Sequence, residues 1–159
     1  MSKAFTDEEG AEPAPVVPAR APLPVGVPNY VTARGLSRLH AELDALRAER
    51  AEDPAQRAAL AQRRAQLEQR IASAERVAPP EERDTVRFGA SVTVESAAGV
   101  RRYRIVGVDE ADAARGDVAF VSPLARALLG RKVGDAVRLR APRGEEELEI
   151  LAVDYPADA

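Results

Sequence analysis

Residues 32–46 read TARGLSRLHAELDAL, and this stretch decides the fold of the N-terminal part of the chain. Its leucines at positions 36, 39, 43 and 46 recur at intervals of three, four and three, the spacing of one stripe on an α-helix. Thr32 stands before the stripe and can cap the helix by accepting a hydrogen bond from a first-turn amide. The sequence therefore predicts an amphipathic helix that begins after Thr32.

Pro54 separates this helix from a second one. Inside a helix a proline loses a hydrogen bond and clashes with the preceding turn, whereas Asp53-Pro54 suits a cap and a first helical residue. We therefore expect the first helix to end near Ala51 and the second to run from Pro54 to about Arg76. Helices joined by so few residues must lie antiparallel, as a coiled-coil hairpin. The second stripe consists of Leu60, Leu67, Ile71 and Ala74.

The residues before the hairpin have a different composition. Six of the twelve prolines lie at positions 13, 15, 18, 22, 24 and 28, after the acidic run Asp7-Glu8-Glu9. Such a stretch buries too little apolar surface to offset its loss of conformational entropy. Residues 1–29 are predicted to be a disordered, proline-rich tail, and residues 30–78 the hairpin.

Beyond Arg83 the hydrophobic period changes to two, which is typical of half-buried strands. Ser122-Pro123 followed by Gly130 supplies a cap, a first residue and a stop for one short helix. Residues 79–159 are thus predicted to form an antiparallel β domain with one short helix, so the fold class is α+β. The expected strands are 86–88, 91–95, 101–106, 118–121, 136–140 and 146–153.

Composition and charge exclude several classes of protein. The chain has no cysteine, so disulfides, thiolate nucleophiles and cysteine-ligated zinc are impossible. Its net charge is -3, and the hairpin region carries nine basic and seven acidic residues, too weak an excess to favour free nucleic acid as a partner. No apolar run approaches the ~20 residues of a membrane span, and residues 1–7 lack a signal-peptide core. We expect a cytoplasmic protein that binds another protein.

The residues offer no catalytic constellation, cofactor motif or metal site. The single histidine, His40, lies beside the leucine stripe without the partners that a metal site or a catalytic triad needs. Three carboxylates, Glu49, Glu52 and Asp53, cluster where the hairpin turns. They could approach a metal or a basic channel. The simpler interpretation, which we favour, is a solvated turn in which Asp53 caps the second helix.

Several strings resemble the Gre transcript-cleavage factors of bacteria, and the N-terminal residues resemble the GreB branch. The resemblance covers residues 29 to 155. The strings that carry it are YVTARGL (30–36), VRFGASV (86–92), YRIVGVDE (103–110), SPLARALLG (122–130), VGD (133–135) and VDY (153–155).

This resemblance implies an FKBP-like β domain that docks on bacterial RNA polymerase beside its secondary channel, and a coiled coil that enters the channel. It implies that Ser122, Pro123 and Arg126 belong to the polymerase-binding surface. Nucleic acid would be reached only indirectly, through the transcription complex. We expect a monomer that is not itself an enzyme and needs no cofactor.

The hairpin departs from the family pattern. Family members that stimulate cleavage carry a Gly-Asp-x-x-Glu-Asn-x-x-Tyr tip whose carboxylates help to hold magnesium, and this string is absent here. The hairpin is about twenty residues shorter, which removes ~15 Å from the rod and makes it similar to short-hairpin relatives such as Rnk. The sequence predicts a regulator without efficient cleavage stimulation. The alternatives are cleavage stimulation through Glu49, Glu52 or Asp53, and prolyl isomerisation by the FKBP-like domain.

Overall fold

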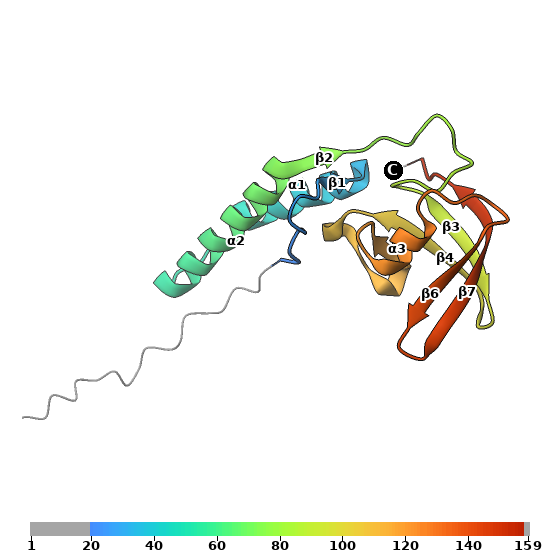
Figure 1. Cartoon of the computed structure of the whole chain (residues 1–159). Coiled ribbons are helices and arrows are strands. Elements are labelled where there is room, and N and C mark those ends of the chain that lie inside the picture. Colours follow the sequence, from blue (N-terminus) through green and yellow to red (C-terminus); the bar gives the residue numbers. More distant parts are fainter. Residues whose placement is uncertain (1–19, 158–159) are drawn as a thin grey trace, which may run out of the picture.

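A helical hairpin projects from one side of a curled β-sheet domain (Figure 1). This computed structural model describes residues 20–157. The hairpin consists of α1 (Ala33–Ala48) and α2 (Pro54–Ser73). The sheet and a short helix, α3 (Pro123–Leu128), follow in the sequence. The predicted α+β class and order of elements are confirmed.

The two helices of the hairpin pack through the predicted leucine stripes. Leu39, Leu43 and Leu46 of α1 and Leu60 and Leu67 of α2 are buried against one another. Each helix begins as predicted: the Thr32 hydroxyl accepts from the Gly35 amide at 3.0 Å, and the Asp53 carboxylate accepts from the Ala55 amide at 3.0 Å. With 16 and 20 residues, the helices are ~24 Å and ~30 Å long. None of the helices in the described range is long and apolar enough to cross a membrane.

The base of the hairpin is closed by two short strands that sequence reasoning missed. β1 (Asn29–Val31) pairs in parallel with β2 (Ala74–Arg76). The prediction that α2 continues to Arg76 was therefore wrong. The Asn29 amide donates at 3.1 Å both to the Arg70 carbonyl and to the Ser73 hydroxyl, and so it binds the last turn of α2. The chain leaves the helix extended at Ala74 because β1 offers it a pairing edge.

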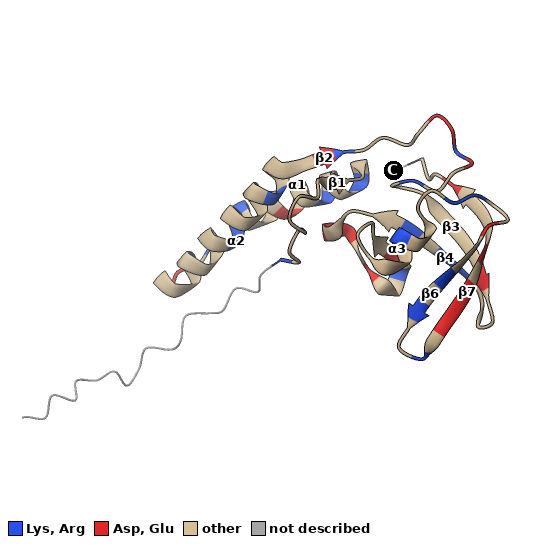
Figure 2. Cartoon of the chain, in the orientation of Figure 1, with Lys and Arg blue, Asp and Glu red and all other residues tan. Residues whose placement is uncertain are grey.

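The β domain is one five-stranded sheet in the order β5-β4-β3-β7-β6. Most neighbouring strands are antiparallel, with a register shift between β3 and β7 at Thr93 and Val94. Between the edge strand β6 and its neighbour β7, Arg138 lies opposite Glu147 and Arg140 opposite Glu145, which places unlike charges side by side (Figure 2). The bounds are β3 Ser91–Ser96, β4 Gly99–Val106, β5 Asp117–Ala119, β6 Ala136–Ala141 and β7 Gly144–Asp154.

Two predictions about the sheet need correction. β5 runs parallel to β4. The segment between the two strands contains the short 3-10 helices η1 (Val108–Glu110) and η2 (Ala113–Arg115), and it carries the chain back along β4 before β5 starts. The sheet is therefore mixed. Residues 86–88 form no strand, since Val86 exchanges its backbone hydrogen bonds with Gly130 and Arg131 in the loop after α3.

A single core fills the concave side of the sheet under α3. Ala125 and Leu128 of α3 are fully buried against strand residues such as Val92, Ile105 and Ile150. The predicted cap of α3 is confirmed, because the Ser122 hydroxyl accepts from the Ala125 amide at 3.2 Å. The helix is thus held by its cap and by its buried face, which leaves its other side exposed.

The predicted tail over residues 1–29 lies largely outside the described residues. Its last part is described, and it contacts the hairpin: Arg20 pairs with Glu42 of α1 at 2.8 Å, and the Arg70 side chain donates to the Ala21 carbonyl. The hydrogen bond with Glu42 raises the pKa of Arg20 above its usual range, and the hydrogen bond with Asp109 raises it further. Burial lowers this pKa but does not outweigh the two hydrogen bonds. Described residues that precede position 30 therefore already contact the hairpin.

Tyr155 provides a test of how the linker, residues 77–90 between β2 and β3, is held. Its hydroxyl donates to the Thr85 carbonyl at 2.5 Å and accepts from the Arg87 amide at 3.0 Å, and burial raises the pKa of this hydroxyl. Below about pH 10 the folded protein keeps the full benefit of the neutral hydroxyl. Above that pH the unfolded chain loses its proton first, so stability falls. We expect Tyr155→Phe to cost about 1 kcal/mol near neutral pH, and this difference to shrink above about pH 10.

Urea unfolding at a series of pH values measures this difference. Tyr103→Phe is the matched control, because the structure gives its hydroxyl no hydrogen bond to any described residue. A difference between the wild type and Tyr155→Phe that stays constant through alkaline pH would contradict the role given to the hydroxyl.

Candidate functional site

The hairpin is fixed to the β domain by one buried carboxylate. Glu110, in η1, is 5% exposed and lies at the N-terminus of α1. It accepts from the Thr32 amide at 3.1 Å, from the Thr32 hydroxyl and from the Gly107 amide at 3.0 Å. A carboxylate at this end also interacts favourably with the helix dipole. We call the contact of Thr32 and Gly35 with Gly107 and Glu110 the joint.

Two glycines make room for the joint. A Cβ atom on Gly35 would lie 2.1 Å from the Glu110 carboxyl carbon, and one on Gly107 would lie 2.4 Å from the Tyr30 carbonyl oxygen. Both positions are therefore closed to any side chain. Gly35 of α1 therefore lies directly against the Glu110 side chain, and Gly107, after β4, lies directly against the backbone of β1 at Tyr30.

Ion pairs surround the joint. Asp109, whose side chain is 4% exposed, lies 3.1 Å from Nε of Arg20 and 3.5 Å from Nε of Arg70. Arg34 of α1 lies 3.5 Å from Asp117 of β5. The acidic partners belong to the β domain, and the basic partners belong to the hairpin or to the segment before it. Because the β domain supplies the acidic groups and the hairpin side supplies the basic groups, attraction between them favours the observed arrangement of the hairpin on the β domain.

Aromatic packing adds an apolar contact beside the joint. Tyr30 of β1 lies 5.9 Å from Phe88 and 5.4 Å from Phe120 between ring centroids, and the two phenylalanines are 5.5 Å apart. Aromatic pairs at this spacing contribute beyond their buried area. The hairpin therefore rests on the β domain through both apolar and charged contacts.

The carboxylates predicted at the hairpin tip do not converge. Asp53 caps α2, and Glu49 lies 3.8 Å from Arg63, while Glu52 is exposed. Across residues 20–157 no group of three or more acidic or histidine side chains is arranged to hold a metal ion. The tip matches the simpler interpretation, in which Asp53 has a capping role.

The Arg64 side chain, which belongs to α2, caps the C-terminus of α1. Its Nε donates to the Leu46 carbonyl at 2.8 Å, and its terminal nitrogen donates to the carbonyls of Arg47 and Glu49 at 3.3 and 3.1 Å. These carbonyls have no partner within the helix, and a positive charge suits this end of the dipole. A polar residue in the stripe thus stabilises the short turn.

The predicted polymerase-binding residues lie together at α3. Pro123 and Arg126 are exposed, whereas Ser122 is half-buried and serves as the cap. The candidate surface on α3 therefore combines the cation of Arg126 with the apolar ring of Pro123.

The joint is the part of the site that sequence reasoning missed. Glu110 and Thr32 are 78 residues apart, so no local pattern connects them. One signal was available: the first turn of α1 contains no acidic residue and has glycine at its third position. A glycine in the first turn weakens a helix, which indicates that another group packs closely against it.

The β domain that carries the hairpin matches a known family model. The family model "Transcription elongation factor, GreA/GreB, C-term" matches residues 80–155. GreA from Nitratidesulfovibrio vulgaris is 45% identical over 74 residues, which is 45% of this chain and 46% of that protein. GreB from Neisseria meningitidis is 45% identical over 83 residues, 50% of this chain and 51% of that protein.

The chain is thus similar to the GreA/GreB transcription elongation factors over residues 80–155, just under half of its length. It spans about half the length of the curated relatives it matches. Among solved structures, Gfh1 from Thermus thermophilus gives a TM-score of 0.41 at 21% identity, covering 80% of this chain and 99% of that one. A GreA/GreB factor from Nitrosomonas europaea gives 0.43 at 23% identity, covering 79% and 98%.

The joint predicts how two substitutions change the stability of the protein, and for one of them the expected change is opposite to that in an ordinary helix. In an ordinary helix Gly→Ala stabilises by up to about 1 kcal/mol, but Gly35→Ala should destabilise because its Cβ would overlap the Glu110 carboxyl group. Glu110→Gln should cost about 2 kcal/mol, since the amide cannot accept from all three donors as the carboxylate does.

Urea unfolding measures both changes, with the exposed Glu149→Gln as the charge-matched control. A Gly35→Ala variant as stable as the wild type would contradict the close approach at the joint.

Proposed function

We propose that this chain regulates transcription elongation by binding bacterial RNA polymerase, without efficiently stimulating transcript cleavage. The β domain docks beside the secondary channel through the α3 surface, and the hairpin points toward the channel. The chain acts as a monomer in the cytoplasm and reaches nucleic acid only through the transcription complex. It is a binding protein rather than an enzyme.

The observation that carries this proposal is a family-matched β domain joined rigidly to a short hairpin. The match over residues 80–155 includes all of α3. Pro123 and Arg126 are exposed on a helix that its cap and its core contacts hold in place. A preorganised surface of this kind loses little entropy on binding.

The carboxylates at the hairpin tip support the proposal that the protein does not efficiently stimulate transcript cleavage. Magnesium requires close oxygen ligands at ~2.1 Å in near-ideal geometry. Here the Asp53 carboxylate is engaged with the Ala55 amide, and Glu49 faces Arg63. Glu52 alone of these three carboxylates has neither a hydrogen bond nor an ion pair with another described residue. One carboxylate on a hairpin of ~30 Å gives little support for metal binding at a distant active site.

Prolyl isomerisation, the enzymatic alternative, receives little support from the aromatic residues. Tyr30, Phe88 and Phe120 pack on one another at the base of the hairpin, and Tyr155 holds the linker. An isomerase needs aromatic side chains that line an open pocket for proline. These rings are already used in internal packing.

Polymerase binding and RNA cleavage should be measured together on stalled elongation complexes that carry end-labelled RNA. We expect the wild-type protein to associate with the complexes and leave the RNA length unchanged. Arg126→Glu should weaken binding about tenfold, equivalent to about 1.4 kcal/mol, by reversing a charge on the α3 surface. Ser122 is a poor choice for this test, because losing its cap would also destabilise α3.

Arg143→Glu is the matched control, since Arg143 is exposed in the turn between β6 and β7. Equal binding by the wild type and Arg126→Glu would exclude α3 as the docking surface. Shortened RNA that depends on Glu52 would show that the tip reaches the catalytic metal and would contradict the non-cleaving role.

A further inference from the structure

The strand β6 is a free edge of the sheet. Among the described residues, β7 lies on one side of β6 and no strand lies on the other. The opposite edge strand, β5, has only three residues, and its first residue, Asp117, already exchanges backbone hydrogen bonds with Asp112. A strand with unpaired backbone groups is a template for a further strand. The six residues of β6 are therefore the longer of the two edges open to another chain.

Alternate residues of β6 turn their backbone groups away from β7. The Ile150 amide donates to the Asp135 carbonyl at 2.9 Å, and in an antiparallel pair such bonds recur at every second residue. The odd-numbered residues of β6 therefore bond to β7. In the described part of the chain, no hydrogen bond from another segment reaches the outward groups. These belong to the even-numbered residues Ala136, Arg138 and Arg140.

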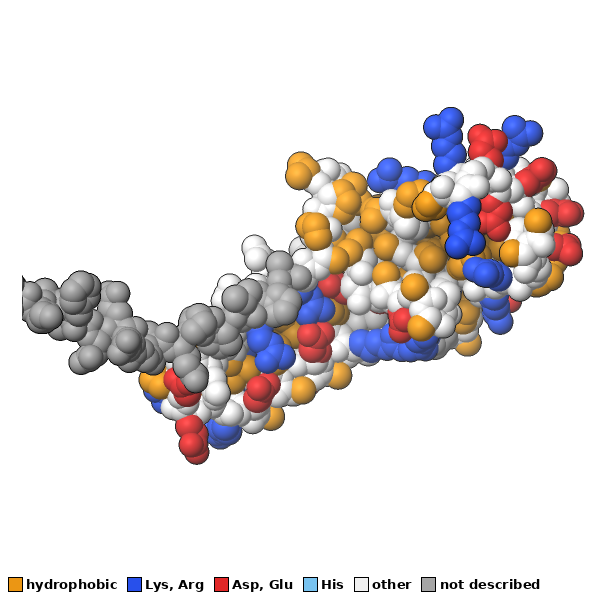
Figure 3. Space-filling view, turned by 90° about the horizontal axis from the view of Figure 1, so that it is seen from below, with side chains coloured by type: hydrophobic (Ala, Val, Ile, Leu, Met, Phe, Trp, Pro, Cys, Tyr) orange, Lys and Arg blue, Asp and Glu red, His pale blue; other side chains and the backbone are white. Residues whose placement is uncertain are grey.

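Two of the three outward-facing residues carry a positive charge. Arg138 is exposed and has no ion pair with another described residue. The Arg140 side chain is 92% exposed, and its Nε lies as far as 4.0 Å from the Glu145 carboxylate. Figure 3 shows Lys and Arg side chains projecting from the surface of the β domain. On β6, free backbone groups and available charge thus occur on the same residues.

The neighbouring strand β7 shows which side chains suit β6. Glu147 lies opposite Arg138, and the next residue, Leu148, lies opposite the buried Val137 on the core side of the sheet. An added strand with the same alternation would place acidic groups beside the arginines and apolar groups beside the half-buried Leu139. A second copy of β6 would instead set arginine against arginine, which is unfavourable.

We propose that β6 binds an extended segment of another protein in which acidic and apolar residues alternate. The segment adds antiparallel to β6 as a sixth strand of the sheet. Backbone hydrogen bonds supply the affinity, and the two arginines select acidic segments over neutral or basic ones. This contact is separate from the proposed polymerase contact on α3, and its test uses the free protein.

Hydrogen exchange of backbone amides in the full chain, followed by NMR, measures the contact residue by residue. The probe is a synthetic peptide of alternating glutamate and valine, of the same length as β6. Without peptide, the amides of Ala136, Arg138 and Arg140 should exchange faster than those of their odd-numbered neighbours. Saturating peptide should slow these three amides about tenfold or more and leave β5 unchanged. Unchanged exchange at the three amides would overturn the proposal.

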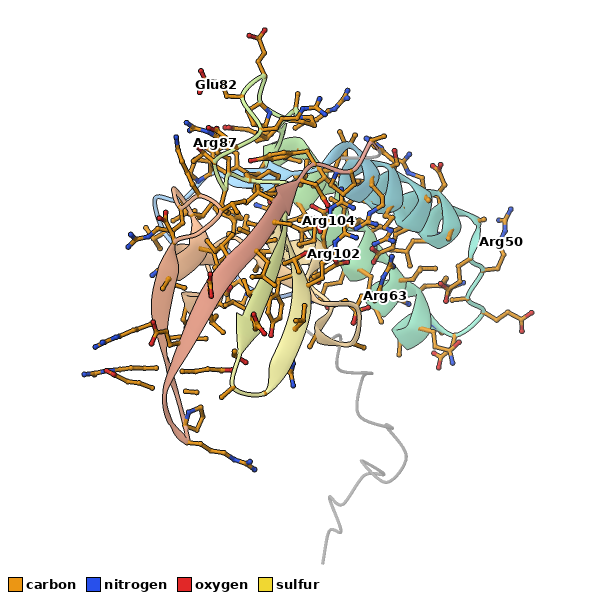
Figure 4. The ribbon with its side chains drawn as sticks, turned by 90° about the vertical axis from the view of Figure 1, so that its right-hand side faces the viewer. Arg50, Arg63, Glu82, Arg87, Arg102 and Arg104 are labelled. Atoms are coloured by element: carbon orange, nitrogen blue, oxygen red, sulfur yellow. The ribbon has the colours of Figure 1, made fainter. Side chains whose placement is uncertain are left out.

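Removing the two charges tests the selectivity. Arg138→Thr combined with Arg140→Thr should weaken peptide binding about tenfold, while threonine keeps a side chain that suits a strand. Arg50→Thr is the matched control and should bind as the wild type does, because Figure 4 shows Arg50 projecting from the turn between the helices, away from the β domain. Equal binding of a lysine–valine peptide would contradict the role of the arginines.

Methylation of peptide nitrogens separates strand addition from simple attraction between charges. Glutamates directly opposite the arginines would exchange backbone hydrogen bonds with them. N-methyl groups on the glutamates should therefore abolish binding to the wild type, whereas N-methyl groups on the valines should not. Equal binding by the two methylated peptides would overturn the proposal. So would outward amides whose exchange slows with rising protein concentration in the absence of peptide, because the occupant would then be a second copy.

Discussion

The Glu110 carboxylate at the start of α1 is the interaction on which the arrangement of the molecule depends. It joins a helix that begins at Ala33 to a 3-10 helix more than 70 residues later in the sequence, η1 (Val108–Glu110), and it satisfies the Thr32 amide, which α1 cannot pair internally. The close approach leaves no space for a side chain at Gly35 or Gly107. Because buried carboxylates are costly unless fully hydrogen-bonded, this contact tolerates few alternative geometries.

A rigid base gives a short hairpin a defined direction. An isolated pair of helices with a few leucines each would be marginal in water. Here the ion pairs of Asp109 and the packing of Tyr30 add contacts at the end nearest the sheet. At the opposite end, Arg64 and Asp53 complete the two helix termini. Polar contacts thus complete both ends of a hairpin whose middle is held by the buried leucine stripes.

The parts predicted from sequence are those governed by local rules. The leucine spacing, and the caps Thr32, Asp53 and Ser122, each depend on residues within one or two turns, and the structure confirms them. The errors involve distant partners. β2 forms because β1 lies beside it, Val86 is paired with the loop after α3, and Glu110 finds Thr32 across 78 residues. The grouping of Pro123 and Arg126 on α3 followed from a family resemblance.

The central claim is that the joint holds the hairpin and the β domain as one rigid body. Residual dipolar couplings of backbone amides in weakly aligned protein measure this directly, since they report the orientation of α1 and α2 relative to strands β3, β4 and β7. The account predicts that one alignment tensor fits both sets of couplings with the orientation seen in Figure 1. Two tensors of different magnitude, as for parts joined by a flexible hinge, would contradict it.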